Sequence, residues 1–323
     1  MTTRRRMLQW SGAALATAAL PGVTWARNWP DKPIRAIVPF TPGSTTDIIG
    51  RIVLSELSGA LGQSIVVENR AGAGGTIGTD LVAKSEPDGY TVLVHASAHS
   101  AAPAAYPRAP YNAARDLAGV TIFGVVPNVT VISPAKGIKT LSELVETAKK
   151  RNVTFASAGV GSATHWAAER LILSAGIKAT HVPYKGGPEA LTDVMTGRVD
   201  FMCTGVSSGL NFIRSGKLLP LAVSTTKRSS ALPEVPTTIE AGFPNSDYTF
   251  WNGLLVPAKT PRPIVDRLYH ETVKVLTHPA VKEKFKPQAV ETMPLKPTEF
   301  DALIAKEIKN NLAIVKAAGL KFN

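Results

Sequence analysis

The chain has 323 residues, 44% of them hydrophobic, and its 36 Lys and Arg against 24 Asp and Glu give a formal net charge of +12. A chain of this length buries a sizeable core and tends to divide into two lobes. Its basic residues are spread thinly and are not interleaved with aromatic side chains, which argues against nucleic-acid binding. Cys203 is the single cysteine, so an intramolecular disulfide and a cysteine-based metal cage are both excluded.

Residues 1–26 have the layout of an export signal. Arg4-Arg5-Arg6 forms a basic start, an apolar run follows from Gly12 to Leu20, and Thr24-Trp25-Ala26 supplies a small-x-small end. The apolar run is shorter than the ~20 residues that span a bilayer, although an uncleaved anchor helix is the alternative. Residues 3–9 also resemble a twin-arginine signal. We therefore expect a mature protein that begins at Arg27, carries a formal charge of +9 without the three arginines, and works outside the cytoplasm.

Apolar β-branched runs alternate with amphipathic helical patterns in the first part of the mature chain. A buried strand is expected at 34–40, Pro42 and Gly43 break it, and Asp47 opens the helix that follows. The other elements expected here are strands at 65–67 and 91–95 and a helix at 77–84.

The alternation continues to about residue 203. Thr140-Leu141-Ser142-Glu143 is a capping box that starts a helix, and Gly176 and Gly197 end two others. The expected strands are 153–157, 181–184 and 199–203, and the expected helices are 164–175 and 188–196. Strands that alternate with helices predict an α/β fold with mainly parallel sheets.

The C-terminal part is helical. Long amphipathic patterns cover 263–277 and 298–318, with Thr298 as the expected cap of the second helix and Gly319 at its end. Pro127 and the stretch 242–248 are the candidate chain crossings between two lobes.

Three loops rich in Gly, Ser and Thr follow strands and open helices, at 42–47, 72–76 and 157–165. In open α/β sheets the carboxyl ends of the strands form the ligand crevice. Glycine lets backbone N–H groups approach an anion, the helix N-terminus adds a favourable dipole, and hydroxyl groups add uncharged donors. One such loop is usually only a turn, but three in equivalent places predict anion binding.

These loops are not nucleotide or metal signatures. The Gly-Lys-Ser/Thr ending of a P-loop is absent, and Gly159-x-Gly161 lacks the third glycine of the dinucleotide fingerprint. No His-x-x-x-His pair or acidic cluster suggests a metal, so no cofactor is expected. His165 lies near a helix start, where it is a base or, more often in proteins, a structural hydrogen-bonding residue.

Gly205-Val206-Ser207-Ser208-Gly209 matches the nucleophile elbow of serine hydrolases, and it falls between a strand and a helix as that motif requires. Asp247 or Asp266, followed by His270 or His278, would complete the order of a triad. Against this reading, no oxyanion segment precedes the motif, and both histidines fall in or at the end of regular helices. A secreted serine hydrolase that uses Ser207 is therefore the alternative function.

A set of short motifs runs in order along almost the whole mature chain, and its order and spacing are more specific than any one motif. The motifs are Pro33-Ile34-Arg35, Val38-Pro39-Phe40, Pro42-Gly43, Thr46-Asp47, Val67-Glu68-Asn69-Arg70, Gly72-x-Gly74-Gly75, Pro87-Asp88-Gly89-Tyr90-Thr91, Ser157-Ala158-Gly159-x-Gly161-Ser162, His165, His181-Val182-Pro183-Tyr184-Lys185-Gly186, Leu232-Pro233-x-Val235-Pro236-Thr237 and Trp251-x-Gly253-Leu254. Together they resemble the Bug (TctC-like) family, the extracytoplasmic solute-binding proteins of tripartite tricarboxylate transport systems.

The resemblance implies a periplasmic-binding-protein fold of type II-like form, with two α/β lobes whose mainly parallel sheets are flanked by helices and joined by a hinge. One lobe would comprise 27–127 and 248–323, and the other 128–247. The protein would be a soluble periplasmic monomer without enzymatic activity. Its implied partners are a small carboxylate and either the membrane components of a transporter or a sensor.

The resemblance also implies which loops face the ligand. The residues are Pro42, Gly43, Ser44, Thr45, Thr46, Asp47, Gly74, Gly75, Thr76, Ser97, Ser157, Ala158, Gly161, Ser162, His165, Tyr184, Lys185 and Thr204.

Two residues depart from the family pattern. Ser44 stands where a second glycine is common, so the first loop can differ in shape. Thr204 stands where many members carry an Asp that can pair with a ligand ammonium. We therefore expect a di- or tricarboxylate or an aromatic acid as ligand in preference to an amino acid.

Overall fold

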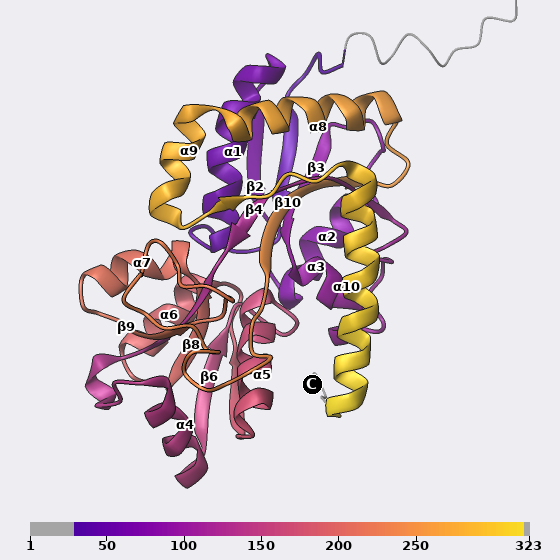
Figure 1. Ribbon diagram of the computed structural model, residues 1–323. Helices are drawn as coiled ribbons and strands as arrows, with labels where there is room; N and C mark the ends of the chain where they lie inside the picture. Colours follow the sequence, from indigo (N-terminus) through magenta and orange to yellow (C-terminus); the bar gives the residue numbers. More distant parts are fainter. Residues whose placement is uncertain (1–28, 320–323) are drawn as a thin grey trace, which may run out of the picture.

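The computed structural model describes residues 29–319, in which two β-sheets lie one above the other (Figure 1). We call the first sheet with its helices the first lobe, and the second sheet with its helices the second lobe. The predicted export signal at 1–26 lies outside the described residues. Within 29–319, no helix is both long and apolar enough to cross a bilayer.

The first lobe contains a mixed six-stranded sheet. Its strands, in spatial order, are β11 (Glu291–Thr292), β4 (Leu117–Val126), β10 (Phe250–Pro257), β3 (Thr91–Ala96), β1 (Ile34–Val38) and β2 (Ile65–Asn69). β1 runs parallel to both β2 and β3. β10 is antiparallel to its two neighbours, β3 and β4, and the edge strand β11 is antiparallel to β4.

Helices cover both faces of this sheet. One face carries α1 (Thr45–Leu61), α8 (Arg262–Thr277), α9 (Pro279–Phe285) and the short η3 (Lys286–Gln288), and the other carries η1 (Ala73–Gly75), α2 (Thr76–Ala83), α3 (Ala98–Ala105) and α10 (Pro297–Ala318). α10, yellow in Figure 1, runs along the first lobe, and its Ile314 and Val315 pack against a hydrophobic cluster that contains residues of both lobes.

The second lobe contains a mixed five-stranded sheet. Its strands, in spatial order, are β7 (Ala179–Pro183), β6 (Val153–Ser157), β8 (Phe201–Gly205), β5 (Asn128–Ile132) and β9 (Leu219–Val223). Its helices are η2 (Pro134–Lys136), α4 (Leu141–Lys150), α5 (Ala163–Ala175), α6 (Gly187–Met195) and α7 (Val206–Arg214). β6 is parallel to β7 and β8, and β5 is antiparallel to β8 and β9.

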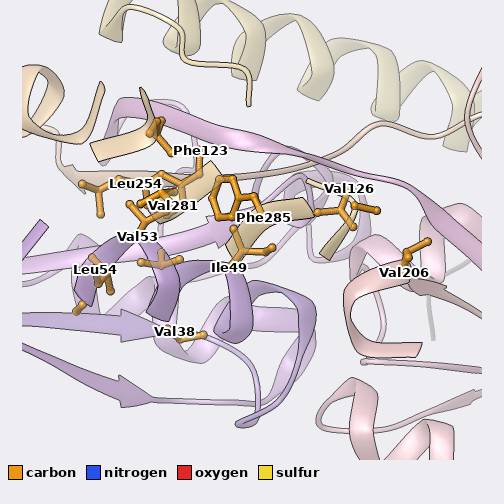
Figure 2. Close-up of a cluster of buried hydrophobic side chains, with 14 of the residues drawn as sticks. Val38, Ile49, Val53, Leu54, Phe123, Val126, Val206, Leu254, Val281 and Phe285 are labelled. Atoms are coloured by element: carbon orange, nitrogen blue, oxygen red, sulfur yellow. The ribbon is translucent and has the colours of Figure 1, made fainter. Parts of the chain in front are cut away.

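The chain passes between the sheets at Pro127, which separates β4 from β5, and again through residues 224–249, which join β9 to β10. The largest hydrophobic cluster extends across this junction. Figure 2 shows Val38, Ile49, Phe285 and other side chains of the first lobe packed together, with Val206 of the second lobe beside them. The two lobes are therefore in packing contact as well as covalently connected.

The α/β class and the predicted elements are confirmed, with ends that differ by a few residues. Gly176 and Gly319 end α5 and α10 in the left-handed conformation, as expected. Thr140 caps α4, although Glu143 accepts from the backbone N–H of Lys139 at 2.7 Å and not from that of Thr140.

Two expectations were wrong. The sheets are mixed and not mainly parallel, because β5, β9, β10 and β11 pair antiparallel with their neighbours. The cap of α10 is Lys296 and not Thr298, because Pro297 already occupies the first helical position and Glu299 accepts from the Lys296 N–H at 3.0 Å.

Candidate functional site

A small cavity lies between the two lobes, at the carboxyl ends of β1, β6 and β8. Its volume of about 20 Å³ has room for roughly one water molecule. The residues that line it are Phe40, Ser44, Thr45, Thr46, Ala96, Ala158, Ser162, Ala163, Thr164, Gly187, Thr204, Ser208 and Phe250. Both lobes contribute, so a molecule held here would touch both.

Four helices begin at this cavity. Ser44 and Ser162 are the N-caps of α1 and α5, and each hydroxyl accepts a backbone N–H three residues later at 3.3 Å. Gly186 and Gly205 occupy the cap positions of α6 and α7. The first turn of a helix leaves backbone N–H groups without helical partners and carries a partial positive charge. Their convergence gives the cavity an electrostatic preference for an anion.

The lining itself is uncharged: none of the described residues around the cavity has an ionisable side chain. Serine and threonine hydroxyls from both lobes supply donors, and Phe40, Phe250 and three alanines form apolar walls. Hydroxyls, N–H groups and helix dipoles can together bind a carboxylate without a salt bridge.

Asp47 supports the first loop from below. The residue is 3% exposed, and its carboxylate accepts from the Gly43 N–H at 2.9 Å, from Arg51 Nε at 2.9 Å and from Asn69 Nδ2 at 2.8 Å. Asn69 also donates to the Phe40 carbonyl at 2.9 Å. This network fixes the turn that presents Ser44 at the start of α1, while Asp47 itself does not line the cavity.

We expect Asp47→Ala to lower the free energy of unfolding by about 2–3 kcal/mol, because it leaves buried donors without an acceptor. Urea denaturation of the ligand-free protein measures this loss. Glu146→Ala is the control, since it removes an exposed carboxylate whose ion pair with Lys149 lies on the surface, and it should leave the midpoint nearly unchanged. Equal midpoints for the Asp47 variant and the wild type would contradict the supporting role.

The second loop is built in a similar way. Thr164 Oγ1 accepts from the Ala158 N–H at 2.9 Å and lies 3.0 Å from Ser162 Oγ. His165 Nδ1 accepts from the Gly161 N–H at 3.0 Å, and Ser157 Oγ lies 2.6 Å from His181 Nε2. Ala158 and Ser162 line the cavity, whereas Ser157, Gly161 and His165 do not. The side chains of Ser157 and His165 hold the loop by hydrogen bonds, and Gly161 faces Ala105 and Tyr106 of the first lobe.

The lobes touch each other around the cavity. Thr45 Oγ1 and Ser208 Oγ are 2.8 Å apart, and the Tyr106 hydroxyl donates to the Val160 carbonyl at 3.1 Å. A Cβ on Gly74 would lie 1.9 Å from that same carbonyl oxygen. The lobes are thus closed on each other, and glycine permits the close approach of the two loops.

The remaining predicted site residues lie at the margins. Gly74, Tyr184 and Lys185 line an open cavity of about 480 Å³ on the outer side of the loop contact. The Tyr184 hydroxyl donates to Asp193 at 2.6 Å, and burial, followed by this carboxylate, raises the pKa of Tyr184 to about 12.

Ser97 accepts from the Tyr248 hydroxyl at 3.1 Å and lines a separate cavity of about 400 Å³ beside α10. Gly75 packs against His95 and caps α2, and the Thr76 hydroxyl donates to the Ala73 carbonyl at 2.9 Å. Pro42 and Gly43 lie in the turn before Ser44, outside the cavity lining.

Five residues that line the cavity lie outside the loops predicted to face the ligand: Phe40, Ala96, Gly187, Ser208 and Phe250. Ala163 and Thr164 line it as well and belong to the predicted loop 157–165. Ser208 is inside the nucleophile-elbow match, and Phe250 belongs to a strand that was not predicted.

Ser207 lies on the strand-to-helix turn that its motif predicts, but its environment is not that of a nucleophile. Its hydroxyl is largely buried and donates to the Gln288 carbonyl at 2.8 Å. In the described residues, neither His270 in α8 nor His278 at the start of α9 hydrogen-bonds to Ser207. This geometry supplies no general base for Ser207.

Comparison with known proteins agrees with the resemblance. The family model described as "Tripartite tricarboxylate transporter family receptor" (TctC) matches residues 49–320. Protein BugT of Bordetella pertussis is 36% identical over 323 residues, which cover 98% of both chains.

Solved structures agree as well. The periplasmic binding protein BugD is 31% identical with a TM-score of 0.87, over 91% of this chain and 99% of that one. An R. palustris protein solved with adipate is 30% identical with a TM-score of 0.87, over 91% and 99% of the two chains. The family and the fold are those of two-lobed substrate-binding proteins, and the chain belongs to the TctC family of tripartite tricarboxylate transporter receptors.

Proposed function

We propose that the protein is a periplasmic, non-enzymatic solute-binding protein that captures a small carboxylate, either a di- or tricarboxylate or an aromatic acid, between its lobes. The observation that carries this proposal is the convergence of four helix N-termini and a set of hydroxyls on one uncharged cavity. The adipate in the R. palustris relative supports the same ligand chemistry. Because the cavity has room for about one water, ligand entry requires the lobes to separate.

In this proposal the lobes comprise 27–127 with 248–323, and 128–247, and they hinge at the two chain crossings. Ser44, Thr45, Thr46, Ser162 and Thr204 donate to the carboxylate from opposite sides of the cavity. The residues below and around the two loops position these donors. The signal-like residues 1–26 direct export by the twin-arginine route. The loaded monomer then delivers its ligand to the membrane components of a tripartite tricarboxylate transporter or to a sensor, without a cofactor.

A thermal-shift screen tests the proposal. The leader-free protein, unfolded and refolded to remove any bound ligand, is heated with citrate, adipate, other di- and tricarboxylates, aromatic acids and acidic amino acids. A ligand at one hundred times its Kd adds ~2.7 kcal/mol of stability, which is a shift of several degrees for a chain of this size. A flat panel with correctly refolded protein would contradict carboxylate binding.

The same screen tests the choice among acids. Since Thr204 offers a hydroxyl and the cavity lining holds no carboxylate, a ligand ammonium has no counter-charge. Aspartate and glutamate are therefore expected to stabilise the protein less than their amine-free analogues succinate and glutarate. Tight and selective binding of either amino acid, measured by calorimetry, would contradict this choice.

Ser207→Ala separates the binding function from the hydrolase alternative. We expect no esterase turnover of p-nitrophenyl acetate above background in either form, because residues 29–319 place no general base beside Ser207. Loss of the hydrogen bond to Gln288 should cost about 1 kcal/mol of stability. An activity present in the wild type and abolished in the variant would overturn the non-enzymatic assignment.

A further inference from the structure

Two histidines are stacked beneath the second-lobe loop. The rings of His165 and His181 have centroids 3.9 Å apart and planes 10° apart, and Phe155 stacks on His181 at 4.8 Å. His165 is 2% exposed, and His181 is partly buried. Two imidazolium ions at this distance would repel each other in a poorly hydrated site, so the stack accommodates neutral rings.

Both rings hold the loop by hydrogen bonds. His165 Nδ1 accepts the Gly161 N–H at 3.0 Å, which requires an unprotonated nitrogen. His181 Nε2 lies 2.6 Å from Ser157 Oγ, and this hydroxyl also accepts from the Gly159 N–H at 3.1 Å. A proton on His165 Nδ1 would place two donors against each other and release Gly161.

The loop held in this way reaches both the cavity and the other lobe. Ala158 and Ser162 line the cavity, and the Val160 carbonyl accepts from Tyr106 of the first lobe. A movement of Gly161 would thus displace its two neighbours, Ser162, which caps α5, and Val160, which makes the contact between lobes.

A carboxylate faces the pair: Glu169 Oε1 lies 3.3 Å from His165 Nε2. Burial, followed by the charge of His165, lowers the pKa of His181 to about 3. Phe155 on β6 stacks on both imidazole rings, and Phe201 on β8 stacks on Phe155 in turn. Tyr106 of the first lobe lies close to Gly161, and burial raises the pKa of its hydroxyl.

We propose that His165 is a positioning residue, which holds the second-lobe loop through its unprotonated Nδ1, so that proton uptake by the stacked pair loosens the loop and weakens carboxylate binding. This inference rests on the proposed function for its consequence, but not for its structural basis. Acidification outside the cell would then favour release of the ligand before the fold is lost.

The decisive experiment needs no ligand. Val160-Gly161 is the single Val-Gly pair in the chain, so protein labelled with ¹³C-carbonyl valine and ¹⁵N-glycine gives one HNCO signal, that of the Gly161 amide. Ring ¹⁵N-histidine spectra follow the imidazoles in parallel. We expect the Gly161 signal to shift with the same pH midpoint as the His165 ring.

His165→Asn is the matched variant, because the asparagine Oδ1 can accept from Gly161 where Nδ1 did but does not titrate in this range. In this variant the Gly161 signal should stay constant over the same pH range. His181→Gln, which keeps a polar atom near Ser157, should shift the midpoint by removing the second ring. Three results would each overturn the proposal. The Gly161 signal could stay constant while the His165 ring takes up a proton, or the His165 ring could stay neutral until acid unfolds the protein. The third is a pH-dependent shift of the Gly161 signal that persists in His165→Asn.

Adipate affinity gives the functional consequence. In the wild type we expect Kd for adipate to rise by up to about tenfold per pH unit below the His165 midpoint, since one proton is linked to release. In His165→Asn the affinity should be independent of pH in that range. Absence of binding by every acid at every pH would refute the proposed function while leaving the Gly161 result intact. Normal pH-independent binding by the wild type would refute the inference alone.

Discussion

Replacing Gly205 with alanine is expected to weaken ligand binding by about one to two orders of magnitude while leaving the stability of each lobe nearly unchanged. A Cβ at this position would lie 2.3 Å from Thr45 Oγ1 and 2.9 Å from Thr45 Cγ2, across the contact between the lobes. Gly205 has φ −62°, so alanine adopts the same backbone without strain. The added methyl therefore opposes lobe closure and not the local fold, and overpacking of this kind costs about 1–3 kcal/mol.

In the proposed function the ligand binds between the lobes, so a penalty on closure should appear directly as lost affinity, at tenfold for every ~1.4 kcal/mol. Isothermal titration with the best ligand of the screen measures the loss, and thermal unfolding of the ligand-free protein checks the fold. Gly59→Ala, on an exposed turn of α1 with no atom within 4 Å of the new Cβ, is the control for the substitution itself.

Thr45→Ala provides the rescue. It removes the two atoms nearest to the new methyl and leaves the Thr45 Cβ at 3.1 Å. The effect of Gly205→Ala should therefore be smaller in the Thr45→Ala background than in the wild type, which a double-mutant cycle measures even though Thr45→Ala itself weakens binding. Equal effects in the two backgrounds would mean that the contact between lobes does not limit binding.

The fold could be predicted where the sequence is locally periodic. The β1–α1–β2 and β6–α5–β7 units follow from apolar strands, helix caps and terminating glycines, all of which act within a few residues. β4 and β5 were not predicted, although 117–132 is apolar and β-branched, because one apolar run interrupted by Pro127 does not reveal that its halves enter different sheets. The antiparallel position of β10 depends on contacts with strands more than one hundred residues away.

The site was predictable to the level of its loops and not of its individual side chains. Gly, Ser and Thr at helix starts identify anion-binding backbone, and Ser44, Thr45, Thr46, Ser162 and Thr204 do line the cavity. Whether a polar side chain at such a loop faces the cavity or turns back to hold the loop depends on what lies beneath it. Asp47 and His165 turn back, and their partly buried partners Asn69 and His181 come from strands further along the chain.

Acidification is expected to destabilise the whole protein through a second pair of histidines, His95 and His99, which lie under the first-lobe loop. Both are fully buried, and His95 packs against Gly75 and the Phe40 ring. Burial lowers the pKa of His99 to about 4 from an ordinary value near 6.5, and burial, followed by the charge of His99, lowers the pKa of His95 well below that value.

The sign follows from proton uptake. Between pH 6.5 and 4, His99 is protonated in the unfolded chain but not in the folded chain. Its contribution to the free energy of unfolding is therefore fully present above pH 6.5 and is lost as the pH falls towards 4. The loss for His99 amounts to about 3 kcal/mol, and His95 adds to it in the same direction. Urea denaturation at half-unit pH steps measures the slope, which should reach about 1.4 kcal/mol per pH unit for each histidine involved.

His99→Gln tests the assignment, because glutamine keeps a donor near the Ala113 carbonyl, which lies 2.9 Å from His99 Nε2, but takes up no proton. In this variant the slope of the unfolding free energy against pH should fall by the contribution of about one proton. His270→Gln, on the exposed side of α8, should leave the slope as in the wild type. Neither His95 nor His99 contacts Gly161, so the global loss of stability and the local release of the second-lobe loop can be measured separately. His99→Gln should change only the slope of the unfolding free energy against pH. His165→Asn should abolish the pH-dependent shift of the Gly161 signal. A slope unchanged by His99→Gln would show that acid acts on the fold through other groups.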